Sequence, residues 1–221
     1  MSLPITPVSK NKDLTVINLF GGPGSGKSTT AAGLFHLMKL KSFDVELVTE
    51  FPKDLVYQQR FNMFFEQDYI FAEQHHRQRR LVQYGVTYCV TDSPLLLSNF
   101  YADENYYSGF LEFTNNVFNS FNNINILVRR IKKYIAKGRN QTPEEARAID
   151  LKTIELFFNK GMNFFVVKGN HRAPDMIMTV LQQETDICDY DVDEMCFVDV
   201  SETNKNSFLN WYEKLQKTIG Y

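Results

Sequence analysis

The sequence predicts a three-layer α/β fold, in which a mostly parallel sheet of about five strands carries helices on both faces. Short runs rich in β-branched and aromatic residues alternate with longer helical segments along the chain. Residues 14–20 form a mostly apolar run that contains Asn18, which is typical of a strand covered on both faces. At 221 residues the chain can bury one good core, so we expect residues 1–221 to form a single domain.

The composition excludes several other classes of protein. A hydrophobic fraction of 43% and an aromatic fraction of 14% indicate a folded chain. The net charge of -2 argues against a protein that coats DNA without sequence preference. No apolar stretch approaches the ~20 residues that span a bilayer, and the N-terminus lacks the apolar core of a signal peptide. We therefore expect a cytoplasmic protein without membrane contact.

The residue pattern predicts the position of each strand and helix. Strands are expected at residues 14–20, 44–49, 86–91, 124–128 and 163–167, with a short last strand at 195–200. Helices are expected at residues 28–40, 53–84 with breaks, 105–121, 142–159, 173–183 and 207–218. The fourth of these helices has the clearest start, because Thr142 can cap it, Pro143 fits its first turn and Glu145 follows the cap by three residues. Gly161 fits its end.

The stretch GGPGSGKSTT, residues 21–30, follows the first strand and matches the phosphate-loop pattern G-x-x-x-x-G-K-[ST]. Its glycines let the backbone turn tightly, so that successive N–H groups and the next helix N-terminus face an anion. Lys27 should reach the β- and γ-phosphates of ATP, and the Ser28 hydroxyl should bind Mg²⁺. The expected nucleotide-binding residues of this loop are Gly22, Gly24, Ser25, Gly26, Lys27, Ser28 and Thr29.

Two acidic residues follow neighbouring strands. Asp92 ends the third strand, GVTYCVTD, and could hold the magnesium or its water shell with Ser28. It could instead cap a helix that has Pro94 in its first turn. Glu50 ends the second strand at the edge where open α/β sheets bind ligands. It could accept a proton from an alcohol nucleophile, hold a substrate hydroxyl or base, or simply be a surface residue.

A basic segment follows the fourth strand, at about residues 129–142. Its cations are Arg129, Arg130, Lys132, Lys133, Lys137 and Arg139. Mobile cations that cover a transferring phosphoryl group exclude water from it, and the planar fork of arginine pairs with phosphate oxygens. We therefore predict a lid in which Arg129 and Arg139 are catalytic and Arg130 contacts the nucleotide. The alternative is an amphipathic surface helix with solvated charges.

The order of these motifs resembles the P-loop nucleoside and nucleotide kinases over about residues 14–170, including kinase domains described as AAA-like and small phage-type nucleotide kinases. The resemblance implies a P-loop NTPase fold and a nucleoside or nucleotide acceptor. It implies that Glu50 is the base and that the loop of Lys168, Gly169 and Asn170 contacts adenine. In deoxynucleoside kinases the third strand has an acid followed by Arg, whereas here Ser93 follows Asp92. Monophosphate acceptors need an arginine grip, for which the candidates are Arg60, Arg77, Arg79 and Arg80.

Two other functions stay open at this level. The acceptor could be a modified base or an end in nucleic acid, held in a groove of the basic residues at 75–80 and 129–139. The chain could instead be a regulatory P-loop ATPase, although no glutamate follows Asp92 to polarise water. The oligomeric state is open as well, a homodimer included.

Overall fold

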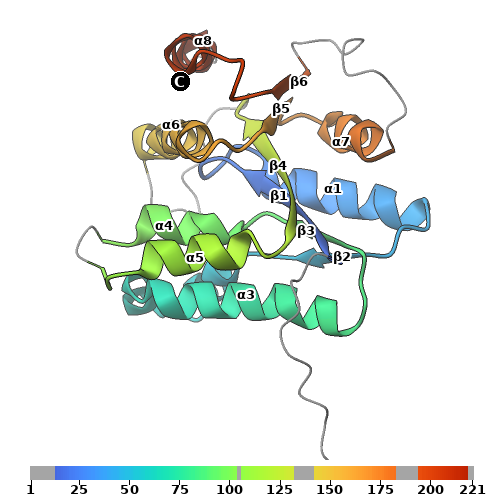
Figure 1. Cartoon of the computed structure of the whole chain (residues 1–221), viewed down its shortest axis with the longest axis vertical. Coiled ribbons are helices and arrows are strands. Elements are labelled where there is room, and N and C mark those ends of the chain that lie inside the picture. Colours follow the sequence, from blue (N-terminus) through green and yellow to red (C-terminus); the bar gives the residue numbers. More distant parts are fainter. Residues whose placement is uncertain (1–12, 104–105, 132–141, 183–193, 219–221) are drawn as a thin grey trace, which may run out of the picture.

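In the computed structural model, the described residues are 13–103, 106–131, 142–182 and 194–218. The middle layer is a six-stranded sheet with the order β2-β3-β1-β4-β5-β6 (Figure 1). Its strands are β1 Thr15–Phe20, β2 Val45–Val48, β3 Tyr88–Thr91, β4 Asn122–Arg129, β5 Phe164–Lys168 and β6 Met195–Val198. Neighbouring strands pair in parallel from β2 to β5, whereas β6 is antiparallel to β5. The predicted three-layer, mostly parallel fold is confirmed.

Helices cover both faces of this sheet, with α1 and α7 on one side and α3, α5, α6 and α8 on the other (Figure 1). The α-helices are α1 Lys27–Leu40, α2 Phe51–Tyr57, α3 Gln67–Gln83, α4 Ser98–Tyr101, α5 Phe110–Phe118, α6 Pro143–Lys160, α7 Ala173–Gln182 and α8 Lys205–Thr218, with short 3-10 turns at Phe61–Phe65 and Leu95–Leu97. Alternate residues of β1 enter the two cores: Ile17 packs with α1 and α7, whereas Val16 and Phe20 pack with the opposite helices.

Two helices differ from the sequence-based prediction. The helical region 53–84 is divided into α2, a 3-10 turn and α3, and Gln59 has a left-handed φ of 57° between the first two. The helix expected at 105–121 begins at Phe110, because Gly109 adopts a left-handed φ of 84° directly before it. Within the described ranges, no helix is both long and apolar enough to cross a membrane.

The predicted start of α6 is confirmed in full. The Glu145 N–H donates to the Thr142 hydroxyl at 3.1 Å, and the Thr142 N–H donates to the Glu145 carboxylate at 2.7 Å. These two bonds form a capping box. Gly161 ends the helix at a left-handed φ of 62°.

Thr142→Ala is expected to lower the free energy of unfolding by about 1 kcal/mol, because it removes the cap acceptor for Glu145. For a chain of this size that loss lowers the thermal midpoint by roughly 2–4 °C. Differential scanning calorimetry measures both quantities. Thr142→Ser keeps the hydroxyl and is the control, so an equal loss in both variants would contradict the capping role.

Candidate functional site

The phosphate loop joins the end of β1 to the start of α1, which is the strand–loop–helix context that the motif requires. Gly21, Gly24 and Gly26 have φ values of 131°, 80° and 110°. Residues other than glycine rarely adopt these φ angles, so the backbone path depends on the three glycines. The loop lies at the carboxyl edge of the parallel strands, where ligands of open α/β sheets bind.

Lys27 is the electrostatic centre of this edge. Its Nζ donates to the carbonyl oxygens of Gly21 at 2.7 Å and Gly22 at 3.2 Å. Burial lowers the pKa of Lys27, and the nearby carboxylates of Glu50, Asp150 and Asp92 oppose this shift. The ammonium group therefore lies within the field of three acids contributed by three different parts of the fold.

Glu50 and Asp92 emerge from neighbouring strands beside the loop. Val48 of β2 pairs with Thr91 of β3, and Thr91 also pairs with Asn18 of β1. The chain therefore carries Glu50 and Asp92 past the same edge of the sheet at which β1 enters the phosphate loop.

The surroundings of Asp92 fit a cation. The side chain is 4% exposed, and its Oδ1 has no hydrogen-bond partner among the described residues. A buried carboxylate oxygen without a partner carries a desolvation cost that a magnesium ion or its water would offset. The cap alternative is not observed, because the next helical turn begins after Pro94 and receives no side-chain cap. Ser28, whose hydroxyl is expected from the sequence to bind Mg²⁺, lies in the first turn of α1.

Helix α3 fixes the backbone around Glu50. The Gln74 amide accepts a hydrogen bond from Phe51 N–H at 3.0 Å and donates to Thr49 O at 3.4 Å. Arg77 donates to the same carbonyl at 3.4 Å and lies over the Phe51 ring at 5.2 Å. The turn that carries Glu50 is therefore held on both sides by side chains of one helix.

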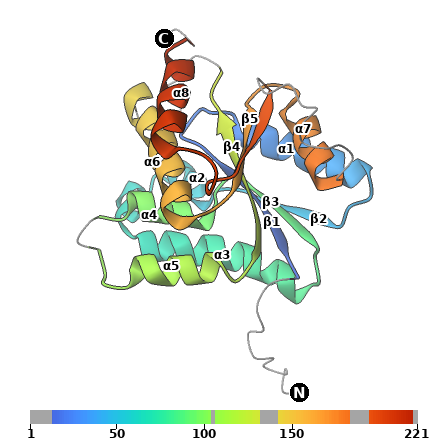
Figure 2. The ribbon, with the colours of Figure 1, turned by 45° about the horizontal axis from the view of Figure 1, so that its top comes forward.

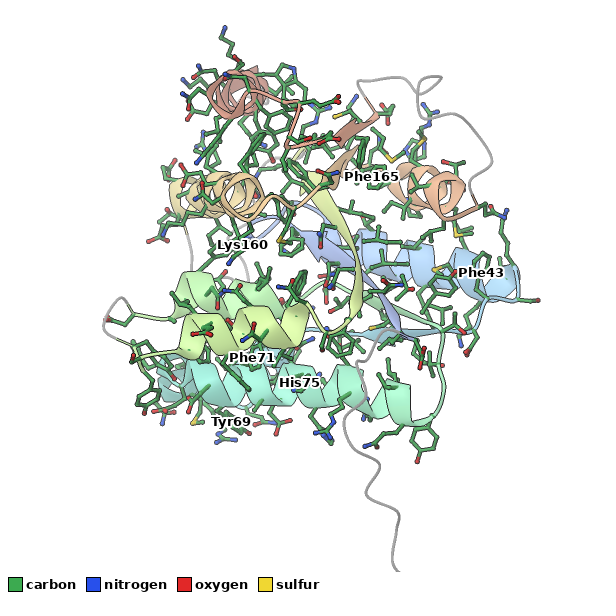
Figure 3. The ribbon with its side chains drawn as sticks, viewed as in Figure 1. Phe43, Tyr69, Phe71, His75, Lys160 and Phe165 are labelled. Carbon is green, nitrogen blue, oxygen red and sulfur yellow. The ribbon has the colours of Figure 1, made fainter. Side chains whose placement is uncertain are left out.

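The four arginines proposed as a monophosphate grip have different surroundings. Arg77 also forms an ion pair with Asp54. Arg79 lines a pocket of about 340 Å³ between α3 and α5. Figure 3 shows Phe71 and His75, which also line this pocket, lying between those two helices. Arg60 and Arg80 are exposed. Arg77 and Arg79 therefore face different neighbours, Asp54 of α2 and the pocket beside α5.

Tyr101 is a residue that the sequence did not single out. It belongs to α4, which packs against α3. It keeps an exposed face, yet burial together with the charges of Glu50 and Asp150 raises the pKa of its hydroxyl to about 12. A neutral phenol therefore lies in the electrostatic range of Glu50. No pattern in the sequence around Tyr101 indicates this.

Arg130 and Asp150 lie beneath the phosphate loop. Both side chains are fully buried and form an ion pair, with Nη2 and Oδ2 3.3 Å apart. Asp150 accepts a hydrogen bond from Gly22 N–H, and Arg130 Nη1 donates to Pro23 O at 2.6 Å. Burial raises the pKa of Asp150, and the Arg130 charge, the Gly22 N–H and Lys27 oppose that shift. Asp150 was missed by the sequence analysis.

The burial of Arg130 changes the interpretation of the predicted lid. Arg130 is committed to backbone and carboxylate partners inside the protein, so it does not face solvent as a lid cation that closes over nucleotide. Arg129 ends β4 at 8% exposure. Its charge lowers the pKa of Cys196 against the raising effect of burial, which places Arg129 toward β6. Lys132, Lys133, Lys137 and Arg139 lie outside the described residues.

The loop after β5 packs on the phosphate loop through Gly169. Its N–H donates to Arg129 O at 2.9 Å, and a Cβ added to Gly169 would lie less than 3.0 Å from Ser25 O. Lys168 and Asn170 both bind the Glu194 carboxylate, at 3.0 and 2.6 Å. Of the three residues expected to contact adenine, Gly169 therefore lies directly beside the phosphate loop, whereas the side chains of Lys168 and Asn170 bind Glu194.

Gly169→Ala is expected to weaken nucleotide binding about tenfold, because the new methyl group displaces the backbone at Ser25. Gly161→Ala is the matched control: its surroundings are open, but its φ of 62° strains alanine. The control should lose about 1–2 kcal/mol of stability without losing nucleotide affinity. Isothermal titration calorimetry with an ATP analogue measures the affinity of both variants. An affinity of Gly169→Ala equal to that of Gly161→Ala would contradict the close packing at Gly169.

The fold and the loop define the chain as a P-loop NTPase of the kinase and ATPase group. A family model described as AAA domain matches residues 16–173, and the chain belongs to this family. Among solved structures it is similar to the NadR protein crystallised in complex with NR, with a TM-score of 0.59 and 13% identity. That match covers 82% of this chain and 55% of the NadR chain, so this chain spans about half of the length of NadR.

A second similar structure is that of APE1195, with a TM-score of 0.39 and 16% identity, covering 79% of this chain and 98% of the other. No curated protein sequence matches this chain. The likeness to NadR, at 13% identity, shows a shared fold.

Proposed function

We propose that the chain is an ATP-dependent phosphotransferase that moves the γ-phosphate to a nucleoside or a nucleoside monophosphate. The observation that carries this proposal is the position of Glu50. Its charge acts on both Lys27 and Tyr101, and it follows β2, whose neighbour β3 leads to Asp92. A carboxylate at this place is suited to a hydroxyl acceptor, whose proton must leave as the phosphate arrives.

The donor side of the site consists of the phosphate loop and its neighbours. The backbone N–H groups from Gly24 to Thr29 would hold the phosphates of ATP, with Lys27 near the γ-phosphate. Ser28 and Asp92 would hold Mg²⁺, which neutralises charge on the phosphates when it is bound. Gly169 and its neighbours would border the adenine.

The acceptor side consists of Glu50 and Tyr101. Glu50 would take the proton from the acceptor hydroxyl, and the neutral Tyr101 hydroxyl would hydrogen-bond the acceptor. Gln74 and Arg77 would keep the Glu50 turn in place through Thr49 and Phe51. A base on a fixed turn meets its substrate in one defined geometry. Such positioning supplies much of the rate enhancement of enzymes of this kind.

Within this class, we favour an uncharged nucleoside acceptor over a monophosphate. Arg77, the candidate grip that lies nearest to the Glu50 turn, already has Asp54 and Thr49 O as partners. A nucleic acid acceptor has less support as well, because Arg129 and Arg130 are buried and add no positive surface to a groove.

Transfer of labelled γ-phosphate from ATP to a panel of acceptors tests the proposal. The panel contains nucleosides, nucleoside monophosphates, and short DNA and RNA. We expect label in at least one nucleoside. If only a monophosphate or only an oligonucleotide is labelled, the acceptor belongs to that class and not to the nucleosides. Label in inorganic phosphate alone, at a rate independent of acceptor, would identify a regulatory ATPase.

A further inference from the structure

We infer that Asp150 and Arg130 are positioning residues, which hold the phosphate loop from beneath in the shape that binds a nucleotide. This inference rests on the proposed nucleotide binding, but not on the identity of the acceptor. It concerns two residues that come from different elements, Arg130 just after β4 and Asp150 in the middle of α6.

Arg130 and Asp150 bind each other and also bind the backbone of the first half of the phosphate loop. The Asp150 carboxylate accepts from Gly22 N–H, and Arg130 donates to Pro23 O, the next residue along. The two side chains then bind each other at 3.3 Å. A Cβ on Gly22 would lie less than 3.0 Å from Ala146 O, so the loop also rests directly on the backbone of α6.

The site is sealed from solvent. Helix α8 lies alongside α6 (Figure 2), and Tyr212 of α8 is fully buried. The charges of Asp150 and Arg130 both act on the Tyr212 hydroxyl, so this ring lies near the pair. In such surroundings the contacts of the pair with the loop are not exchanged for water.

Stability alone does not explain this arrangement. A buried ion pair is often no more stabilising than well-packed apolar residues of similar size. Here, however, the polar atoms of the pair are directed at the backbone of a loop rich in glycine. Glycine has high conformational freedom, so an unsupported loop would lose much entropy when phosphate orders it. A loop that is already held binds its ligand more tightly, because the ordering cost is not part of binding.

Two double variants separate this role from a structural one. Arg130→Met with Asp150→Leu removes the charges and the acceptor for Gly22 N–H. Arg130→Met with Asp150→Asn also removes the charges but keeps an amide oxygen that can accept from Gly22. Each double variant leaves one buried polar group unpaired, the Gly22 N–H in the leucine variant and the side-chain NH₂ in the asparagine variant, so the two should have similar stability. The leucine variant should nevertheless bind a non-hydrolysable ATP analogue with Mg²⁺ about tenfold more weakly.

Titration calorimetry measures the affinities, and thermal unfolding measures the stabilities. At similar stability, a purely structural pair would give the two variants similar affinities, whereas positioning gives the leucine variant the weaker affinity. Equal affinities of the double variants, with intact binding by the wild type, would overturn the inference alone. A wild type that binds no nucleotide would overturn the proposed function and this inference with it.

Single variants keep the test usable if a double variant fails to fold. Arg130→Lys retains a charge near Asp150 but lacks the fork that reaches both Asp150 and Pro23 O. It should raise the KM for ATP and leave the KM for the acceptor unchanged; an unchanged KM for ATP would count against the inference. Glu144→Gln, which breaks the exposed pair with Arg147 on the same helix, should bind nucleotide like the wild type.

Discussion

Lys27→Ala is expected to slow phosphoryl transfer by on the order of 10³-fold, and to leave the fold intact. In the structure the ammonium group binds two carbonyl oxygens of the phosphate loop, Gly21 O and Gly22 O. The phosphates of ATP would draw it from these carbonyls, and it would then stabilise the charge that develops on the transferring group. An alanine supplies no such charge.

Lys39→Ala is the matched control for this variant. Lys39 belongs to the same helix, α1, and forms an exposed ion pair with Glu46. Its removal should leave the rate of transfer unchanged. Initial rates of labelled product, with circular dichroism to verify folding, decide the matter. A folded Lys27→Ala protein with wild-type rates would refute the assignment of the loop.

The lowered pKa of Lys27 gives this residue a pH signature as well. Burial favours the neutral amine, so the ammonium group loses its proton at a lower pH than an exposed lysine does. The value of kcat/KM should therefore fall on the alkaline side before the ordinary lysine pKa is reached.

Glu50→Gln is expected to lower kcat by roughly 10²–10⁴-fold, because glutamine cannot accept the proton of the acceptor hydroxyl. The substitution is nearly isosteric, and the turn at Glu50 remains held by Gln74 and Arg77. Glu46→Gln is the control, since Glu46 lies on β2, the strand that leads to Glu50, and forms an exposed pair with Lys39. It should have wild-type kinetics.

The division between kcat and KM decides the role of Glu50. A loss in kcat with little change in KM indicates a base that acts in the transition state. A rise in KM alone would mean that Glu50 only positions the acceptor, and would contradict its role as the base.

The sequence predicted the parts of the site that are local in the chain. The phosphate loop, the strand before it and the helix after it lie within residues 15–40, and their pattern is specific. Glu50 and Asp92 follow β2 and β3 within two residues, and the sequence shows this arrangement as short β-rich runs followed by an acid. The cap of α6 was predictable for the same reason, because Thr142 and Glu145 are only three residues apart.

The missed features depend on contacts between distant segments. Gly22 and Asp150 are separated by 128 positions, and no local pattern relates them. Arg130 belongs to a run of charges that is typical of a solvated segment, and only the packing of α6 and α8 shows that it is buried. The proposed role of Tyr101 likewise depends on the three-dimensional proximity of α4 to Glu50.

The most direct test of the central claim is the fate of the γ-phosphate in a single reaction. Labelled ATP and the best nucleoside acceptor are incubated with the protein, and label is counted in the acceptor and in inorganic phosphate. We predict that label enters the acceptor, that this transfer depends on acceptor concentration, and that Glu50→Gln suppresses it. Label that enters inorganic phosphate at the same rate with or without acceptor would contradict this prediction.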